Sequence, residues 1–199
     1  FRSRAFFQFG NGSNWAPESK LYLSGSNLEN MMNNKFTRSK GFINSEYLGY
    51  GESINHFHHS GGLNLRGYSG YLAPEYDDNG NFDFVGYKGT SGGSINLEVD
   101  FTSLIPRSIN TIGIKPYIFA DAGIITNKEL SRENFIDTFS EIRADAGIGF
   151  FINVSQLTPL ETVNPLTVRL DFPLFLNRPP ANDKDYFMFR WLFGISKLF

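Results

Sequence analysis

The chain has 199 residues, a formal net charge of −2 and no cysteine. The slight negative charge argues against nucleic acid as a partner, because nucleic-acid-binding proteins carry clustered positive charge. The lack of cysteine excludes disulfide bonds and thiolate metal sites.

No apolar run reaches the length of roughly 18 residues that a transmembrane helix needs, so the sequence excludes such a helix. The 20 glycines and the many Asn, Ser and Asp residues are typical of strands joined by turns and loops. Residue 1 is Phe and lies inside a strand-like run. We therefore expect the chain to be a piece of a longer protein.

Short strands are predicted near the start of the chain, at Phe1–Phe9 and Lys20–Leu23. Residues 26–91 follow no regular period and are rich in Asn, Gly, Ser, His and Asp, apart from a short excursion at Phe82–Lys88. A structureless span of this length is uncommon inside a compact domain. It is expected for an extracellular or lumen loop of a membrane barrel.

The pattern becomes regular from Gly92 onward, where apolar and polar residues alternate in successive segments. These segments are Ser94–Phe101, Lys115–Ile124, Arg143–Ile152 and Leu166–Phe172. Because side chains of a strand alternate between two faces, each segment places its charges on one face only. The charged residues of this face are Glu98, Asp121, Arg143, Asp145, Arg169, Asp171 and Arg190. We expect them to pair across an enclosed interior.

The last thirteen residues, Phe187–Phe199, predict one long terminal strand. Its odd positions form an almost continuous aromatic face, with Phe187, Phe189, Trp191, Phe193, Ile195, Lys197 and Phe199. In water such an edge strand would promote aggregation. In a bilayer the lipid covers the apolar face, and about 9–11 residues suffice to cross.

These patterns together predict an all-β fold, an antiparallel transmembrane β-barrel; the family resemblance given below implies that this chain is the C-terminal portion of the barrel. About seven strands are expected, with the long loop at residues 26–91 and the last five strands in residues 92–199. The alternative is a soluble β-sandwich that acts as a binding module, in which the apolar faces would pack against a second sheet.

Several short motifs along residues 61–199 carry a family resemblance. Gly61–Tyr68 reads Gly-Gly-Leu-Asn-Leu-Arg-Gly-Tyr, and Phe119–Gly123 reads Phe-Ala-Asp-Ala-Gly after the strand with Leu97-Glu98. Ala144–Gly149, Arg169–Leu174 and Phe189–Phe199 follow in order. This ordered set resembles the bacterial surface antigen superfamily. The superfamily comprises outer-membrane protein assembly barrels (BamA type), two-partner-secretion transporters and barrels fused to enzymes.

The resemblance implies a barrel of about sixteen strands in the outer membrane of a Gram-negative bacterium. It implies a function in outer-membrane protein insertion or polypeptide translocation. The implied partners are outer-membrane lipid and lipopolysaccharide, the remaining N-terminal strands of the barrel, and assembly-complex subunits or unfolded outer-membrane protein cargo. No cofactor and no metal is implied.

The resemblance also assigns roles to particular residues. The loop motif Leu65, Arg66, Gly67 and Tyr68 would fold back into the barrel, where Arg66 would meet Asp121 and Glu98. The lumen partners of the loop are Glu98, Phe119, Asp121 and Gly123. The terminal strand, acting as assembly signal and lateral gate, would use Phe189, Trp191, Phe193, Gly194 and Phe199.

The sequence departs from the assembly barrels in one respect, because residues 26–60 are inserted before the loop motif. This insertion resembles barrels fused to soluble enzymes, including zinc aminopeptidase-like proteins. The alternative function is therefore a membrane anchor for a peptidase or lipase whose catalytic domain lies upstream. We expect no enzyme in the segment itself.

One further cluster is His56-Phe57-His58-His59, in which three imidazoles could bind a metal ion. The sequence has no Cys, and no Glu is spaced as in a His-Glu-x-x-His motif. We interpret the cluster as a group of histidines at a loop tip.

Overall fold

A computed structural model gives the architecture of the chain. It describes residues 1–10, 16, 19–25, 56, 58, 60–69, 71, 73–76, 79–101, 112–126, 139–154, 166–179 and 185–195. No helix within these ranges is long and apolar enough to span a bilayer.

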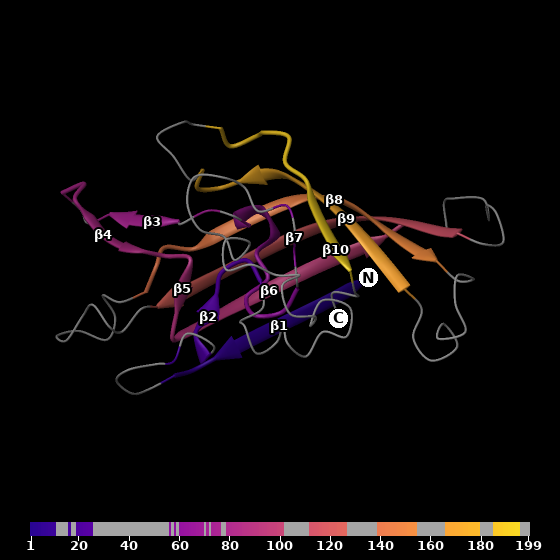
Figure 1. Cartoon of the computed structure of the whole chain (residues 1–199). Helices are drawn as coiled ribbons and strands as arrows, with labels where there is room; N and C mark the ends of the chain where they lie inside the picture. Colours follow the sequence, from indigo (N-terminus) through magenta and orange to yellow (C-terminus); the bar gives the residue numbers. More distant parts are fainter. Residues whose placement is uncertain are drawn as a thin grey trace.

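A six-stranded antiparallel sheet forms the main part of the fold (Figure 1). Its strands, in spatial order, are β1 (Arg2–Gln8), β6 (Ser91–Asp100), β7 (Ile112–Thr126), β8 (Arg143–Val154), β9 (Leu166–Leu176) and β10 (Leu192–Ile195). The predicted all-β, antiparallel fold is confirmed. Among the described residues the sheet is open, with β1 and β10 as its edge strands.

The strands form where apolar and polar side chains alternate, and the two faces differ sharply. One face exposes apolar side chains to the outside: Phe7 is 76% exposed, Ile95 57%, Ile118 44% and Phe187 77%. The opposite face buries its charged residues. All seven charged positions predicted for that face, Glu98, Asp121, Arg143, Asp145, Arg169, Asp171 and Arg190, are buried.

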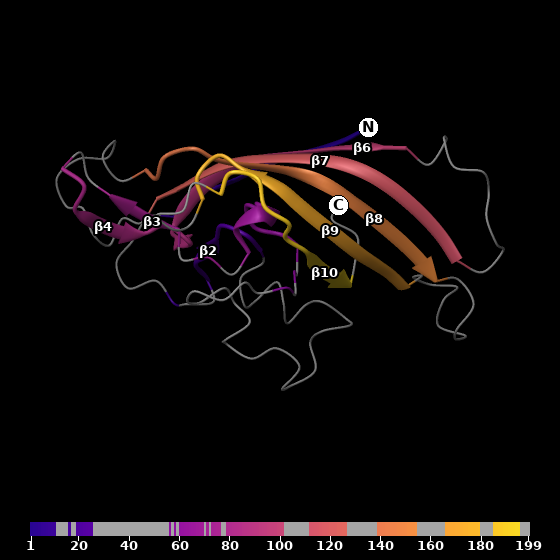
Figure 2. The ribbon, with the colours of Figure 1, turned by 90° about the horizontal axis from the view of Figure 1, so that it is seen from above.

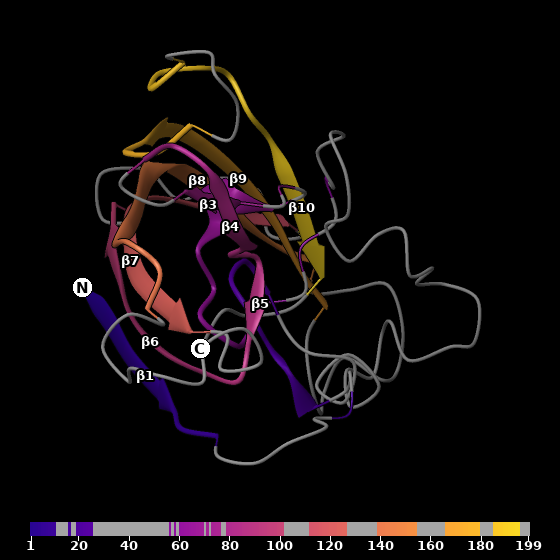
Figure 3. The same ribbon diagram turned by 90° about the vertical axis from the view of Figure 1, so that its left-hand side faces the viewer.

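The sheet is curved, and the segment that precedes β6 lies on its concave side (Figures 2 and 3). This segment carries a 3₁₀ helix, η3 (Arg66–Tyr68), and two small sheets. One small sheet pairs β2 (Leu21–Tyr22) with β5 (Lys88–Gly89), and the other pairs β3 (Pro74–Tyr76) with β4 (Phe82–Val85). The strand predicted at Lys20–Leu23 therefore exists only as β2 and does not join the main sheet, which has six strands rather than the seven expected.

The hydrophobic core lies between η3 and the concave face. It consists of Leu21, Leu23, Leu63, Leu65, Tyr68, Tyr71, Ala73, Ile125 and Leu176. Most of these residues come from the loop side, and Ile125 and Leu176 come from β7 and β9. Burying about nine such side chains favours the seated loop, since each fully buried large apolar side chain contributes about 1.5–3 kcal/mol.

The terminal strand is shorter than predicted. The expectation of one strand from Phe187 to Phe199 is wrong for the described residues: β10 covers Leu192–Ile195, and Phe187 forms only an isolated bridge with Phe175. Residues 196–199, and with them Phe199, lie outside the described residues.

Two features of β9 explain the interruption. Pro173 has no backbone N–H to donate to a ladder. The β8–β9 register also shifts between Ala146 and Gly147, which leaves Leu174 as an extra residue on β9. The β10 register would place Phe187 opposite Leu176, but the bridge is to Phe175, one residue away.

Candidate functional site

The loop motif sits on a backbone scaffold that β2 provides. The N–H of Leu65 donates to the carbonyl of Leu23 at 3.0 Å, and η3 begins directly afterwards. The N–H of Tyr68 then donates to the carbonyl of Leu65 at 3.2 Å. The turn of η3 thereby directs the Arg66 side chain onto the sheet, and all three residues of η3 are buried.

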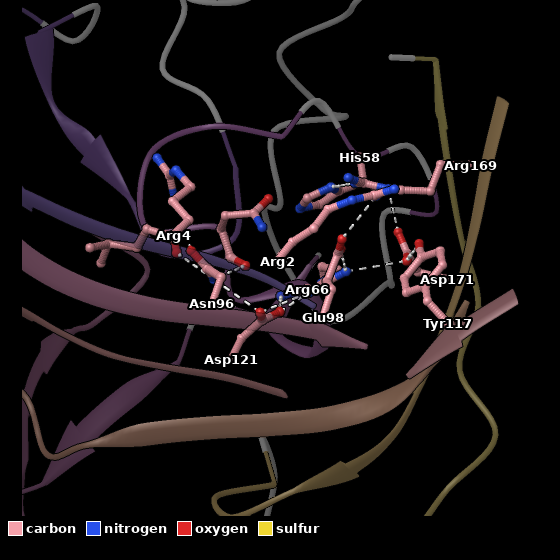
Figure 4. A network of polar contacts seen from close by, with 12 residues as sticks. Arg2, Arg4, His58, Arg66, Asn96, Glu98, Tyr117, Asp121, Arg169 and Asp171 are labelled. Carbon is pink, nitrogen blue, oxygen red and sulfur yellow. Dashed lines mark hydrogen bonds and ion pairs between the residues drawn. The ribbon is translucent and has the colours of Figure 1, made fainter. Parts of the chain in front are cut away.

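Arg66 is fully buried and contacts two carboxylates on neighbouring strands (Figure 4). Its Nε donates to Oδ2 of Asp121 at 2.7 Å and its Nη2 to Oδ1 of the same carboxylate at 2.8 Å. Its Nη1 donates to Oε1 of Glu98 at 2.7 Å. Such a two-pronged pair fixes direction as well as distance, because the guanidinium is a rigid planar fork.

The guanidinium also lies over the ring of Phe119, with Cζ at 3.8 Å from the ring centroid, in the geometry of a cation–π contact. Burial lowers the pKa of Arg66, but Asp121 first and then the neighbouring carboxylates outweigh this effect and hold that pKa well above its usual value. Arg66 is therefore a permanent cation.

Two further residues tie the loop backbone to β1 and β6. Asn96 donates through Nδ2 to the carbonyl of Asn64 at 3.1 Å and to Oδ1 of Asp121 at 3.0 Å. Arg4 donates to the carbonyl of Gly62 at 2.8 Å and to Oδ1 of Asn96 at 3.0 Å. These bonds satisfy buried polar groups that would otherwise weaken the seat of the loop.

A second group of charges extends the network toward β9. Nη1 of Arg66 lies 3.5 Å from Oδ1 of Asp171, and Nε of Arg169 lies 2.6 Å from Oδ2 of Asp171. The hydroxyl of Tyr117 donates to Asp171. Arg169 also contacts the ring of His58, which belongs to the segment before the motif (Figure 4).

Gly67 is required because the loop lies directly against the wall of the sheet. A Cβ at this position would lie 2.4 Å from Cδ2 of Leu176 and 2.7 Å from Cβ of Asp145. Tyr68 follows and donates its hydroxyl to Oδ1 of Asn177 at 2.8 Å. Burial raises the pKa of Tyr68 to about 12, so this hydroxyl stays protonated.

An ion cluster at the start of β8 secures the segment that follows η3. Nη2 of Arg143 lies 2.5 Å from Oε1 of Glu75, and Nη1 of Arg178 lies 3.0 Å from Oε2 of Glu75. Arg178 also pairs with Glu141. The same Arg143 lies over the ring of Tyr68, at 5.4 Å from its centroid, and so joins the cluster to the loop motif.

The structure brings the loop motif and its expected lumen partners together in one place. Arg66 contacts Glu98, Phe119 and Asp121 on the concave face. Leu65 lies against Gly123, where a Cβ would be 2.9 Å from the leucine side chain. Asp145 lies beside Gly67, and Arg190 donates to the carbonyls of Met188 and Asp185.

The residues assigned to the terminal strand lie apart from this network. Phe189 and Trp191 are exposed on the apolar face, whereas Phe193 and Gly194 belong to β10. Within the described residues, Gly194 approaches the network through Arg169, whose Nε lies 3.6 Å from the position of a Cβ.

Several residues of the site were not identified from the sequence. Arg4, Tyr117, Glu75 and Asn177 all bind the loop or its network. Arg4 carried a usable signal, because it alternates with Arg2 on one face of the first strand. The interpretation of the histidines as a loop tip is wrong for His58, which is 2% exposed and contacts Arg169.

The arrangement as a whole is a clamp. Three N–H groups of Arg66 donate to carboxylates, and the ring of Phe119 covers one face of the guanidinium. These contacts hold η3 against two strands, β6 and β7. Breaking a buried pair costs far more than the net stability that the pair provides, which favours a single loop position.

No family model, no curated protein and no solved structure matches this chain.

Proposed function

We propose that this chain is the C-terminal part of an outer-membrane β-barrel of the bacterial surface antigen superfamily. The barrel would act in outer-membrane protein insertion or polypeptide translocation. The observation that carries the proposal is the contrast between the two faces of one curved sheet: exposed aromatic and aliphatic side chains outside, and a buried ionised clamp inside.

The outer face supports a lipid environment. Phe7, Ile95, Ile118 and Ile148 are each more than a third exposed and lie on four different strands of the sheet, β1, β6, β7 and β8. An apolar surface that spans a whole sheet marks an interaction with membrane or protein. In the outer membrane, lipid would cover these side chains. Pairing of β1 and β10 with further strands would provide partners for the backbone N–H and C=O groups of these two edge strands.

The concave face supports an interior that the loop partly fills. Arg66 and the core residues around Leu65 fix η3 against β6, β7 and β8. A loop held in this way narrows the passage through the barrel. The barrel then has a defined resting state when no cargo is passing. The clamp would hold the barrel wall and the loop in register while the ends of the sheet move.

We call the outer edge of β10, where the described sheet ends, the seam. The weak pairing of β10 with β9 favours movement of a polypeptide at this edge. In the described residues, the ladder between β9 and β10 is interrupted before Leu192, and only the isolated bridge between Phe175 and Phe187 continues it. An interrupted ladder has fewer hydrogen bonds to break, and Gly194 contributes no side-chain packing. Parting of the sheet at this edge would expose backbone groups that an incoming strand can use.

A second candidate function is a membrane anchor for an upstream peptidase or lipase. It is favoured by the insertion at residues 26–60, which resembles barrels fused to soluble enzymes. In that case the barrel would carry no cargo, and the clamp would serve stability alone.

Tryptophan fluorescence tests the lipid environment. The chain has two tryptophans, so Trp15→Phe leaves Trp191, which is 42% exposed on the apolar face. We expect vesicles with bromine on the acyl chains to quench Trp191 relative to the same lipid without bromine. Absence of quenching, with a protein that stays dispersed in buffer without detergent, would contradict the membrane proposal.

Crosslinking separates the two candidate functions. A photo-reactive amino acid at Ile195, on the seam, is expected to capture unfolded outer-membrane protein added to the reconstituted full chain. The same group at Ile118, in the middle of the lipid-facing side, is the control. Capture at neither position, with quenching intact, would favour the anchor.

A further inference from the structure

Asp145 is a buried carboxyl group on β8 that the clamp does not use. The residue is 2% exposed, and within the described residues neither of its carboxyl oxygens makes a hydrogen bond of normal distance and angle. A buried carboxylate in this situation is costly, because it has lost water and gained no donor in exchange. The state of this group therefore needs a physical account of its own.

The group that faces Asp145 across the sheet is a second carboxyl group. Asp121 is its direct partner in the ladder between β7 and β8, and both side chains are buried on the concave face. Side chains at such opposite positions have Cβ atoms about 4.5–5.5 Å apart. Two negative charges at this separation repel each other, and the repulsion is strong where water is excluded.

Asp121 takes the donors that could have served Asp145. Its two oxygens accept bonds from Nε and Nη2 of Arg66, and Oδ1 also accepts a bond from Nδ2 of Asn96 (Figure 4). The remaining nitrogen of the guanidinium, Nη1, donates to Glu98. Asp121 is therefore the ionised member of the pair, and Asp145 is the member without a bound cation.

The seated loop covers the carboxyl group of Asp145. A Cβ on Gly67 would lie 2.7 Å from Cβ of Asp145 and 3.1 Å from its Cγ, so the backbone of η3 rests on this group. Leu176 of β9 packs against the same position and brings no charge. The loop and the leucine together keep water away from Asp145 while η3 is seated.

The titratable and charged groups around Asp145 come from β7, η3 and β8. They are Asp121, Arg66, Tyr68 and Arg143. Arg143 lies two positions away on the same face of β8, but its Nη2 donates to Glu75. The hydroxyl of Tyr68 donates to Asn177. One guanidinium is therefore left beside two carboxyl groups, and its side-chain bonds go to only one of them.

We propose that Asp145 and Asp121 form a binding site for one proton, which Asp145 carries while the loop is seated. A protonated carboxyl group is uncharged and can donate its O–H to the carboxylate that faces it. The proton removes the repulsion between the two groups and gives Asp145 a hydrogen bond in place of water. It also leaves Asp121 ionised for Arg66, so the proton completes the clamp.

The proton links the seating of the loop to pH. When η3 leaves the concave face, water reaches Asp145, which then ionises at neutral pH as an ordinary aspartic acid does. The seated loop therefore binds one proton more than the released loop. By linkage, each unit of rising pH disfavours the seated state by up to about tenfold, from the ordinary aspartic acid value of about 4 until Asp145 ionises in place. A mildly acidic medium holds the loop, and an alkaline medium releases it.

The pH dependence of loop seating tests the proton site. In Asp145→Asn the side chain keeps nearly the same shape, and its amide donates to Asp121 without a proton from solvent. The readout is chymotrypsin cleavage after Tyr68 or Tyr71, which are both buried in the seated loop, with the full chain in detergent micelles. Dividing the rate for the unmodified chain by the rate for Asp145→Asn at each pH cancels the pH dependence of the protease. We expect this ratio to rise about tenfold or more between about pH 5.5 and about pH 8.5.

Asp100→Asn is the matched control. It removes a partly exposed carboxylate of β6 that pairs with Arg2, so its cleavage should keep the pH dependence of the unmodified chain.

Infrared spectroscopy detects the proton directly, in a detergent that has no ester groups. The C=O stretching band of a protonated carboxyl group is separate from the bands of carboxylates and amides. At neutral pH we expect a band of this kind that the unmodified chain and Asp100→Asn share and that Asp145→Asn lacks. In the unmodified chain alone, the band should disappear as rising pH makes the loop cleavable.

Both measurements have a result that overturns the inference. A constant ratio of cleavage rates over the pH range would show that seating of the loop takes up no proton at Asp145. A band of a protonated carboxyl group that is absent from the unmodified chain, or equal in Asp145→Asn, would show that Asp145 is ionised under the loop. The inference does not rest on the membrane proposal, which is tested separately by quenching of Trp191 with brominated lipid.

Discussion

Replacing Arg66 by alanine removes the centre of the clamp. The guanidinium is fully buried and holds Asp121 with two bonds and Glu98 with a third. The substitution leaves both carboxylates buried without their cation. Breaking a buried pair by removing one partner typically costs about 3–5 kcal/mol.

This cost is expected to fall on the seating of the loop and not on the sheet. The ladders of β6, β7 and β8 consist of backbone bonds that do not involve Arg66. At about 1.36 kcal/mol for each tenfold change, the loop should leave the concave face about 10²–10⁴ times more often. Residues 26–91 should then become accessible while the strands persist.

Limited digestion with chymotrypsin measures this effect, because its Phe and Tyr sites are unchanged by the substitution. We expect faster cleavage within residues 26–91 and an unchanged β-sheet circular dichroism signal. Arg66→Lys keeps the charge but loses the planar fork, so its cleavage rate should lie in between. Arg2→Ala is the control, because it removes two ion pairs of a half-exposed arginine, with Glu98 and Asp100, each worth no more than about 1 kcal/mol. Equal cleavage rates in Arg66→Ala and the unmodified chain would refute the clamp.

Three further perturbations address the loop and the chain end. In Gly67→Ala, a Cβ 2.4 Å from Leu176 should unseat the loop, so that chymotrypsin cleaves it as fast as it does the Arg66 variant; a protected loop would contradict the close approach. Tyr68→Phe removes the bond to Asn177 and should lower the free energy of unfolding in denaturant titrations by about 0.5–1.5 kcal/mol, and an unchanged midpoint would speak against that bond. Deleting Phe199 should reduce the amount of protein in the outer membrane, measured by fractionation, whereas normal levels would argue against a terminal assembly signal.

The period of the sequence was sufficient to predict β6, β7, β8 and β9 and their faces. Alternation is a local property, because each residue of a strand points away from its neighbour whatever the strand pairs with. For this reason the charges at Glu98, Asp121 and Asp171 could be placed on one face, and the structure buries all three there. Apolar residues of the other face, such as Ile95, Leu97 and Ile118, are exposed, as the pattern predicts.

The partners of the clamp depended on more than the period. The pairing of Arg66 with Asp121 and Glu98 was implied by a family resemblance, and the structure shows those contacts. Composition and spacing alone favour an exposed Arg-Gly-Tyr turn over a buried one. The contribution of Glu75 carries no such signal, since it depends on which segments meet in space. For Arg4 the sequence offers only its alternation with Arg2, which indicates a face of the strand but not the partner.

What the sequence by itself determined is therefore the alternation, the two faces and the position of the motif. Only the tertiary structure decided the pairing of β1 with β6 across the whole loop, the exclusion of β2 from the sheet and the shortened β10. It also decided that Asp145 faces Asp121 across the ladder of β7 and β8 and lies under Gly67. The physical reason is that a strand's own residues set its faces, whereas its neighbours are set by distant backbone groups competing for the same hydrogen bonds.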